Sequence, residues 1–267
     1  MKLKKERLDV LVHARGLAET RSLAQRLIMA GRVRVADQVI IKPSHMVDPA
    51  LPVTLEAGEQ YVSRGGEKLK AALSAFDMQD LSGWVCVDIG ASTGGFTDCL
   101  LQHNARMVFS VDVGHGVLHW KLRNDPRVVV MERTNARFLS GFPQKIDLVT
   151  VDASFISLKL IVKPMVDWLE TDARLITLIK PQFEAGRRDA ARGEGVIRDP
   201  EVQKRVLSDL FRVMRSYNFG LMGVIRSPLL GPKGNVEFLA AWVFRRLDHI
   251  PPEDAVEGLF AVDRNVG

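Results

Sequence analysis

Between residues 84 and 244, short apolar runs alternate with longer amphipathic stretches. The runs that predict β-strands cover residues 84–88, 107–112, 128–131, 146–152, 174–179, 222–227 and 236–244. Helical spacing of apolar residues is found over 93–102, 155–169 and 200–217. Strands that alternate with helices are typical of a parallel α/β sheet. The last run follows a short turn, so we predict a doubly wound, Rossmann-like α/β fold with seven strands and an antiparallel final strand.

The first sixty residues show a different pattern. Thr20 is suited to cap the start of a helix that runs through Ile28, and Gly31 is well placed to end it. Two short alternating stretches follow, at 32–35 and 39–41, with a turn at Asp37-Gln38 between them. We therefore predict three parts, namely a small α+β domain over 1–60, the α/β domain over 61–248 and a C-terminal tail over 249–267 without functional signal.

Composition excludes several classes of protein. With 46% hydrophobic and 26% charged residues, the chain of 267 residues is neither disordered nor a spanning membrane protein, because no stretch approaches about 18 apolar residues. Its two cysteines, Cys86 and Cys99, lie in apolar segments, which predicts buried, reduced thiols in a cytoplasmic protein. The net charge of +5 is too small to indicate a polyanionic partner without regard to where the charges lie.

A glycine-rich loop follows the first strand of the α/β domain. It reads Asp88-Ile89-Gly90-Ala91-Ser92-Thr93-Gly94-Gly95-Phe96, which departs from the dinucleotide fingerprint and is no phosphate-binding P-loop. The carboxylate of Asp88 disfavours a pyrophosphate and suits a ligand with a cationic amino-acid end. Asp112 ends the second strand, where a carboxylate can accept hydrogen bonds from both hydroxyls of a ribose. The alternative is a glycine turn that serves only helix–sheet packing.

This loop with its downstream acid resembles class I S-adenosylmethionine-dependent methyltransferases. The resemblance implies S-adenosylmethionine as cofactor and assigns the cofactor-binding residues Asp88, Gly90, Ala91, Ser92, Gly94, Gly95, Phe96, Asp112 and Asn135. We expect Asn135 to bind the adenine edge through its amide, with Glu132 as the rival residue. No metal site is expected, because the histidines at 103, 115 and 119 lack a supporting cluster of cysteines or carboxylates.

Four charged residues stand in distinctive segments. The segments are Ser63-Arg64-Gly65-Gly66-Glu67-Lys68, Val151-Asp152-Ala153-Ser154-Phe155, Leu178-Ile179-Lys180-Pro181 and Lys233-Gly234-Asn235-Val236-Glu237. Matched residue by residue, they resemble the Lys-Asp-Lys-Glu tetrad of FtsJ-like RNA ribose 2′-O-methyltransferases, which makes Lys68, Asp152, Lys180 and Glu237 the candidate catalytic residues. Each of them taken alone is as well explained as a solvated surface charge.

The tetrad makes chemical sense for methylation of a ribose hydroxyl. A neutral Lys180 can take the hydroxyl proton while the oxygen attacks a sulfonium methyl group. The nearby cation Lys68 and removal from water favour neutral Lys180, whereas Asp152 and Glu237 favour its charged form. The sequence leaves this balance open.

The basic residues of the first domain complete the resemblance. Residues 7–9, 20–22 and 28–35 resemble an S4 RNA-binding module, which in front of an FtsJ-like domain is similar to the TlyA family of ribosomal RNA methyltransferases, also called haemolysins. The family implies a cytidine ribose in 16S rRNA, 23S rRNA or both as the target. The candidate RNA-binding residues are Arg7, Arg21, Arg26, Arg32, Arg34, Arg64, Arg187 and Arg188, with Arg15 nearby and a Gly/Arg-rich loop at 186–198.

Other readings of the sequence remain. The small basic module is also explained as a solvated charged face. The family's second name suggests a membrane-active haemolysin, for which neither a spanning segment nor a strongly amphipathic helix is visible. A non-catalytic RNA-binding or ribosome-assembly factor is a third reading, against which the complete tetrad and glycine loop speak. The oligomeric state and the choice between ribosomal subunits stay open.

Overall fold

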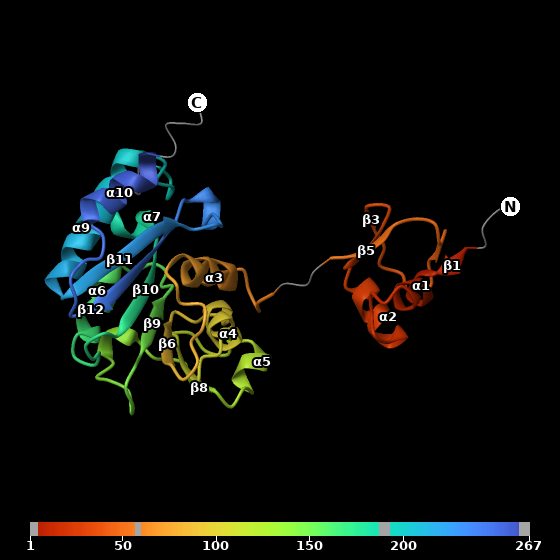
Figure 1. Cartoon of the computed structure of the whole chain (residues 1–267), viewed down its shortest axis with the longest axis horizontal. Coiled ribbons are helices and arrows are strands. Elements are labelled where there is room, and N and C mark those ends of the chain that lie inside the picture. The colour runs from red at the N-terminus through yellow and green to blue at the C-terminus, as the bar shows by residue number, and fades with distance from the viewer. Residues whose placement is uncertain (1–4, 57–59, 187–192, 262–267) are drawn as a thin grey trace. The chain divides into compact units, whose positions relative to one another are not determined.

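The chain folds into two compact units. The computed structural model describes residues 5–56, 60–186 and 193–261, and contacts divide it into Met1–Gln60 and Tyr61–Gly267 (Figure 1). The candidates Arg187 and Arg188 therefore lie outside the described residues. In the part of the chain so described, no helix is long and apolar enough to cross a membrane. Cys86 and Cys99 are both buried free thiols.

The first unit is a small α+β fold with two short sheets. Its elements are β1 (Glu6–Arg7), α1 (Leu8–Ala14), α2 (Arg21–Met29), β2 (Val33–Val35), β3 (Gln38–Val39), β4 (Met46–Val47) and β5 (Val53–Leu55). β1 pairs with β4, and β2 lies between β3 and β5. Thr20 Oγ1 accepts a hydrogen bond from Leu23 N, which confirms it as the cap of α2. The turn between β2 and β3 lies at Ala36-Asp37, one residue earlier than predicted, because these two residues take the positive φ that this tight turn requires.

The second unit is built on a seven-stranded sheet in the part of the chain described. Its elements are α3 (Gly65–Ala75), β6 (Val85–Ile89), α4 (Gly95–Gln102), β7 (Met107–Val111), α5 (Trp120–Arg123), β8 (Val128–Met131), η1 (Ala136–Phe138), β9 (Leu148–Val151), α6 (Leu158–Met165), β10 (Arg174–Ile179), α7 (Pro181–Glu184), α9 (Pro200–Ser216), β11 (Phe219–Arg226), η2 (Pro232–Gly234), β12 (Phe238–Phe244) and α10 (Pro252–Ala261). The strand order is β11-β12-β10-β9-β6-β7-β8, and β12 is antiparallel to both of its neighbours. The predicted α/β fold with an antiparallel seventh strand is confirmed.

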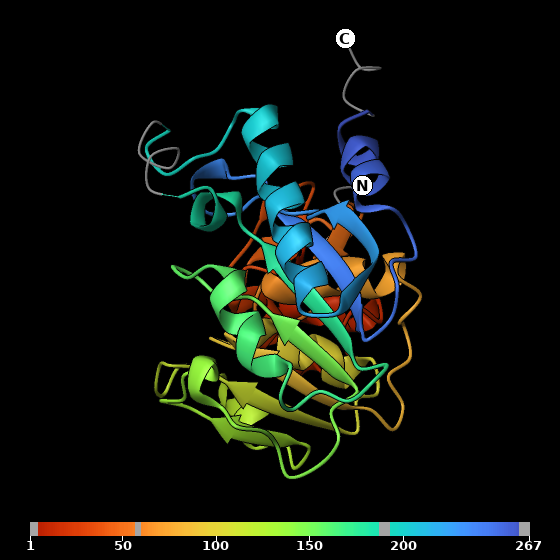
Figure 2. The same ribbon diagram turned by 90° about the vertical axis from the view of Figure 1, so that its left-hand side faces the viewer.

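Helices cover both faces of this sheet. One apolar core contains Leu69 of α3 and Leu100 of α4, and the other contains Ile161 of α6, Leu207 of α9 and Phe260 of α10. Figure 2 looks onto the face covered by α6 and α9. Every residue of β12 is buried, as expected for a strand with helices on both sides and a neighbour on each edge.

The segment set apart above as a C-terminal tail contains an ordered helix. Contacts group it with the second unit. In α10, Val256 and Phe260 are buried in the core beside α9, and the ring centroid of Phe260 lies 6.0 Å from that of Phe238. The described part of the segment therefore contributes to the packing of the α/β fold.

Candidate functional site

The glycine-rich loop lies at the carboxyl edge of the sheet, between β6 and α4. Gly90 has φ +82°, and a Cβ atom there would lie 2.5 Å from the carbonyl oxygen of Asp152. Gly94 has φ +100°, and a Cβ atom there would lie 2.2 Å from the side chain of Leu122. Both positions require glycine, since the left-handed backbone and the close neighbours exclude a side chain. The loop is thereby held close to the end of β9 and to α5.

Four charged residues form two ion pairs at this edge. Lys68 Nζ lies 2.5 Å from Glu237 Oε2, and Lys180 Nζ lies 2.5 Å from Asp152 Oδ1. The Glu237 side chain is fully buried, and 9% of the Lys180 side chain is exposed. Each pair therefore has one buried member, Glu237 or Lys180, and removing its partner would leave that buried charge uncompensated.

Sheet register brings the two pairs to one end of the sheet. Ile179 pairs with Phe238 at the last rung between β10 and β12, so Lys180 and Glu237 are the next residues on the two strands. Asp152 follows β9 on the other side of β10. Lys68 comes from α3. The structure thus brings all four candidate catalytic residues together.

A hollow of about 300 Å³ opens beside these pairs, and we call it the tetrad hollow. Its lining includes Arg64, Lys68, Ala91, Gly95, Phe96 and Asp152. Gly231 also lines it, and a Cβ atom at Gly231 would lie 2.0 Å from Glu237 Oε1. That buried oxygen has no hydrogen-bond partner among the described residues. Glycine at 231 therefore lets the backbone close over the Glu237 carboxylate.

A second hollow of about 410 Å³ adjoins the first, and we call it the Asp112 hollow. Gly90, Ser92 and Asp152 line both hollows, while Val111, Val113 and Ile161 give the second one apolar walls. Asp112 lines it and accepts hydrogen bonds from the backbone N–H groups of Ser92 (2.8 Å) and Gly114 (2.7 Å). The carboxylate is thus fixed in place with lone pairs left for a ligand.

Asn135 and its rival Glu132 are placed differently. Asn135 lines the Asp112 hollow, and its Oδ1 accepts a hydrogen bond from Arg137 N. Glu132 lines neither hollow and is bound by Arg123 and His115. Of the two residues, the structure brings only Asn135 to the hollow.

Asp88 does not reach either hollow. It is fully buried and accepts hydrogen bonds from Thr97 Oγ1 (2.7 Å) and Thr150 Oγ1 (3.2 Å). Burial raises the pKa of Asp88 to about 7, although the two threonine hydroxyls oppose the shift. Gly94 is likewise absent from both linings, because it packs against Leu122. Asp88 and Gly94 therefore stabilise the loop through contacts with neighbouring side chains and do not line the hollows.

Phe155 is a residue of this site that the sequence did not single out. Its side chain is 91% exposed, it lines the Asp112 hollow, and its φ of +64° is a strained value for a phenylalanine. Its ring centroid lies 5.2 Å from that of Phe183. Strained backbone tends to persist at functional sites. The apolar pattern alone places a phenylalanine in a core, so no local signal identified it.

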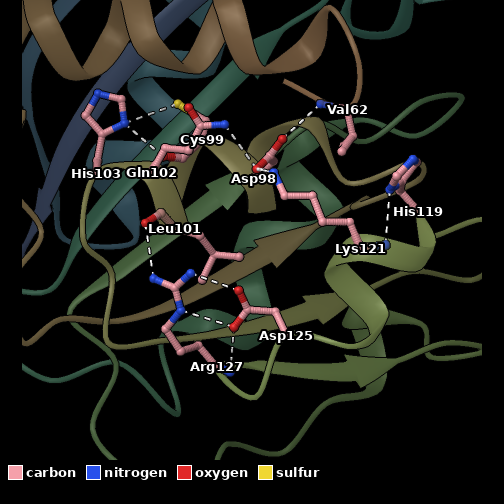
Figure 3. Close-up of polar contacts among 10 residues, drawn as sticks. All are labelled: Val62, Asp98, Cys99, Leu101, Gln102, His103, His119, Lys121, Asp125 and Arg127. Atoms are coloured by element: carbon pink, nitrogen blue, oxygen red, sulfur yellow. Dashed lines mark hydrogen bonds and ion pairs between the residues drawn. The ribbon is translucent and has the colours of Figure 1, made fainter. Parts of the chain in front are cut away.

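Asp98 joins the elements that carry the loop and Lys68. It is buried in α4 and accepts hydrogen bonds from Val62 N (2.9 Å), Gln102 Nε2 (3.1 Å) and Lys121 Nζ (3.2 Å), as Figure 3 shows. Val62 lies just before α3, and Lys121 lies in α5. The carboxylate therefore fastens the chain before α3, and α5, to the helix that begins in the glycine-rich loop.

The candidate RNA-binding arginines of the first unit are mostly engaged by acceptors of their own unit. Arg7 and Arg21 both bind the buried carboxylate of Asp9, and their hydrogen bonds hold its pKa far below the usual range. Arg32 donates to the backbone carbonyl oxygen of Glu56, and Arg34 forms an ion pair with the Glu56 side chain.

Of the remaining candidates, Arg15 and Arg26 also lie in the first unit, whereas Arg64 lies in the second. Arg15 donates to the carbonyl oxygens of Pro49 and Leu51. Arg26 and Arg64 are exposed. The guanidinium groups that the sequence suggests for phosphate are therefore partly committed to holding the small fold together.

Comparison with known proteins agrees with this geometry. A seven-stranded sheet with an antiparallel strand inserted near one edge, a glycine-rich loop after its first strand and an acid after its second define a class I methyltransferase. A model of FtsJ-like methyltransferases matches residues 61–244, and an S4 domain model matches residues 6–51. The chain belongs to the FtsJ-like methyltransferase family, carries an S4 domain in front, and is therefore an enzyme.

Relatives resemble the chain over nearly its whole length. The 16S/23S rRNA (cytidine-2′-O)-methyltransferase TlyA of Mycobacterium tuberculosis is 43% identical over 249 residues, which is 92% of each chain. YqxC of Bacillus subtilis, a candidate rRNA methyltransferase, is 46% identical over 246 residues, 90% of this chain and 86% of that protein. The solved structure of a candidate hemolysin from Streptococcus thermophilus has a TM-score of 0.72 at 37% identity and covers 98% of both chains.

Proposed function

We propose that this enzyme transfers a methyl group from S-adenosylmethionine to the 2′-hydroxyl of a cytidine ribose in ribosomal RNA. One observation carries the proposal: the ion pairs Lys68–Glu237 and Lys180–Asp152 lie together beside the tetrad hollow. This hollow adjoins the Asp112 hollow. The relative TlyA is named as a methyltransferase of cytidine riboses in 16S and 23S rRNA, and the arrangement of charges suits a proton transfer from a hydroxyl group.

The Asp112 hollow fits the nucleoside part of S-adenosylmethionine. The carboxylate of Asp112 is held by two backbone N–H groups and can accept both ribose hydroxyls, while apolar walls such as Ile161 suit the flat adenine ring. Asn135 offers its amide to the adenine edge. The backbone of Gly90, Ala91 and Gly95 borders the tetrad hollow, where the methionine end would bind. The cofactor supplies an electrophilic methyl group on a sulfonium sulfur.

Lys180 acts as the general base in this proposal. Its neutral amine takes the proton of the ribose 2′-hydroxyl as the oxygen–carbon bond forms and the carbon–sulfur bond breaks, so charge is conserved. Asp152 holds the amine from one side. Lys68, fixed by the buried Glu237, lines the tetrad hollow and can bind the attacking oxygen as negative charge develops on it. Phe155 offers an exposed ring on which a nucleobase can stack.

The RNA partner requires further contacts. The S4 domain and the basic loop at 186–198 provide charge for phosphate groups. An enzyme with ribosomal RNA as substrate would work in the cytoplasm, where ribosomes are present.

One assay tests the function. The protein is incubated with tritiated S-adenosylmethionine and either isolated ribosomal subunits or naked rRNA, and the labelled ribose is mapped by nuclease protection. We expect label on the 2′-oxygen of a cytidine. Label on a base would contradict the proposed chemistry. Absence of transfer together with lysis of erythrocytes would favour a haemolysin, and RNA binding without transfer would favour an assembly factor.

A further inference from the structure

Lys180 is held by two neighbours of different kinds. Its Nζ lies 2.5 Å from Asp152 Oδ1, but that buried oxygen has no hydrogen bond among the described residues, so the contact is an ion pair alone. The same Nζ donates a hydrogen bond of 2.9 Å to Ser154 Oγ. An ion pair attracts in every direction, whereas a hydrogen bond fixes the direction of one N–H bond.

The direction of that N–H bond matters for a lysine that acts as a base. A neutral amine has two N–H bonds and one lone pair around the Cε–Nζ axis. When one N–H bond is fixed, two directions remain for the lone pair, and the Asp152 carboxylate attracts the second N–H bond into one of them. The last direction is left for the lone pair.

We propose that Ser154 is a positioning residue for the methyl transfer, whose hydroxyl aims the Lys180 lone pair at the ribose 2′-hydroxyl. The proposal rests on the proposed function, in which Lys180 is the base. Ser154 is exposed, and among the described residues its hydroxyl bonds only to Lys180. Its hydroxyl therefore has little part in folding.

The other charged groups around Lys180 do not replace this hydrogen bond. Glu237, next to Lys180 across the end of β10 and β12, binds Lys68 through Oε2, and its Oε1 makes no hydrogen bond to Lys180 or to any other described residue. Glu184 of α7 accepts hydrogen bonds from Ser157 Oγ and Leu158 N. The ring of Phe183, 5.9 Å from Lys180 Nζ, is a non-directional neighbour. Ser154 is the uncharged acceptor in this set.

The test compares Ser154→Ala with Ser154→Thr in the full-length protein. Single-turnover methyl transfer to ribosomal subunits is measured from pH 5.5 to 9. For Ser154→Ala we expect a plateau rate about 10-fold to 100-fold lower, because the lone pair is no longer aimed. We also expect the acid limb to move to lower pH, because a hydroxyl acceptor stabilises the protonated amine more than the neutral one. Ser154→Thr keeps the hydroxyl and should restore both.

Ser157→Ala is the matched control. It removes a hydroxyl from the same loop that bonds Glu184 instead of Lys180. It can lower the rate by loosening the loop, but it should leave the midpoint of the acid limb unchanged. The same midpoint shift in Ser157→Ala, or no shift in Ser154→Ala, would overturn the role of Ser154.

A second measurement does not depend on activity. The pH titration of the Lys180 side chain is followed by NMR of its ¹³Cε in the protein alone, with the signal assigned from a Lys180→Arg variant. The midpoint should fall in Ser154→Ala and return in Ser154→Thr. If the wild-type protein transfers no methyl group to a ribose, the proposed function fails; if it does so while both midpoints stay unchanged in Ser154→Ala, only the role of Ser154 fails.

Discussion

Asp88 is a fully buried carboxyl group beneath the glycine-rich loop, and its environment changes how the protein responds to pH. Burial raises the pKa of Asp88 to about 7, whereas in the unfolded chain it is near the ordinary value of 3.8. The folded protein therefore binds a proton that the unfolded chain has lost between these two pH values. Asp88 contributes most stability below about pH 4, and that contribution is lost as the pH rises to about 7.

Asp88→Asn should flatten this dependence. The amide keeps the shape and one acceptor for Thr97 or Thr150 but does not ionise. In urea unfolding of the second unit, the wild type should lose up to about 4 kcal/mol between pH 4 and 7 from this residue, and the variant should not. The exposed Asp37→Asn serves as control. Parallel pH curves for the wild type and Asp88→Asn would show that Asp88 is ionised in the folded protein throughout.

Lys180 is the residue on which the proposed chemistry depends most. Lys180→Ala removes the base, and we expect the single-turnover rate to fall by about 100-fold to 10,000-fold. The affinity for S-adenosylmethionine, measured by calorimetry, should change by less than about twofold, because Lys180 lines neither hollow. Asp112→Ala is the converse control and should weaken cofactor binding. A near-normal rate in Lys180→Ala would exclude this lysine as the base.

At the scale of secondary-structure elements, the site depends on how α3, α4 and α5 are joined. Lys68 lies on α3, and the glycine-rich loop leads into α4. The Asp98 carboxylate accepts hydrogen bonds from Val62 N before α3 and Lys121 Nζ on α5 (Figure 3). Its fixed position explains how residues far apart in sequence keep one geometry at the sheet edge.

Asp98→Ala should loosen this junction. It leaves the Val62 N–H without its acceptor, which costs about 1–3 kcal/mol locally. We expect amide hydrogen exchange at Val62 to speed up by about tenfold or more. Asp125→Ala is a matched control, since Asp125 pairs mainly with the neighbouring Arg127. Unchanged exchange at Val62 in Asp98→Ala would mean that other contacts hold the segment.

At the scale of the whole molecule, the net charge of +5 does not describe which charges the protein can offer to a polyanion. In the first unit, Arg7 and Arg21 neutralise Asp9, and Arg34 pairs with Glu56. The loop at 186–198 adds four arginines against two acidic residues, since it contains Arg187, Arg188, Arg192 and Arg198 with Asp189 and Glu194. Fewer arginines are therefore available to phosphate groups than the sequence suggests, and several of the remaining ones are concentrated in the loop at 186–198.

The double variant Arg187→Glu with Arg188→Glu tests the loop. It should weaken binding to ribosomal RNA and lower the slope of log affinity against log salt by about 1 to 2, because fewer counterions are released. Fluorescence anisotropy at several salt concentrations measures both effects. Arg212→Glu with Arg215→Glu, which changes the charge equally on α9, is the control. An equal slope for the wild type and the loop variant would exclude the loop from phosphate contact.

Much of the architecture follows from local patterns. Apolar runs and helical spacing predict the seven strands and the main helices, because burial between two helical layers requires near-continuous apolar residues. The spacing of Gly90, Gly94 and Asp112 predicts a cofactor loop, and the order of four charged residues predicts their association through family resemblance. Boundaries differ by a few residues, as at β11, which begins at Phe219 instead of 222.

Long-range packing accounts for the rest. Insertion of β12 between β10 and β11 sets Glu237 beside Lys180, and no local pattern encodes which strands pair. Asp88 is buried and lines neither hollow. Arg7 and Arg21, which the sequence suggests as phosphate-binding residues, form ion pairs with Asp9. The sequence alone therefore identifies which residues are chemically able to take part in the reaction, because side-chain type is a property of each residue by itself. Their partners, protonation and direction, as for Lys180 and Ser154, arise from contacts between segments distant in sequence.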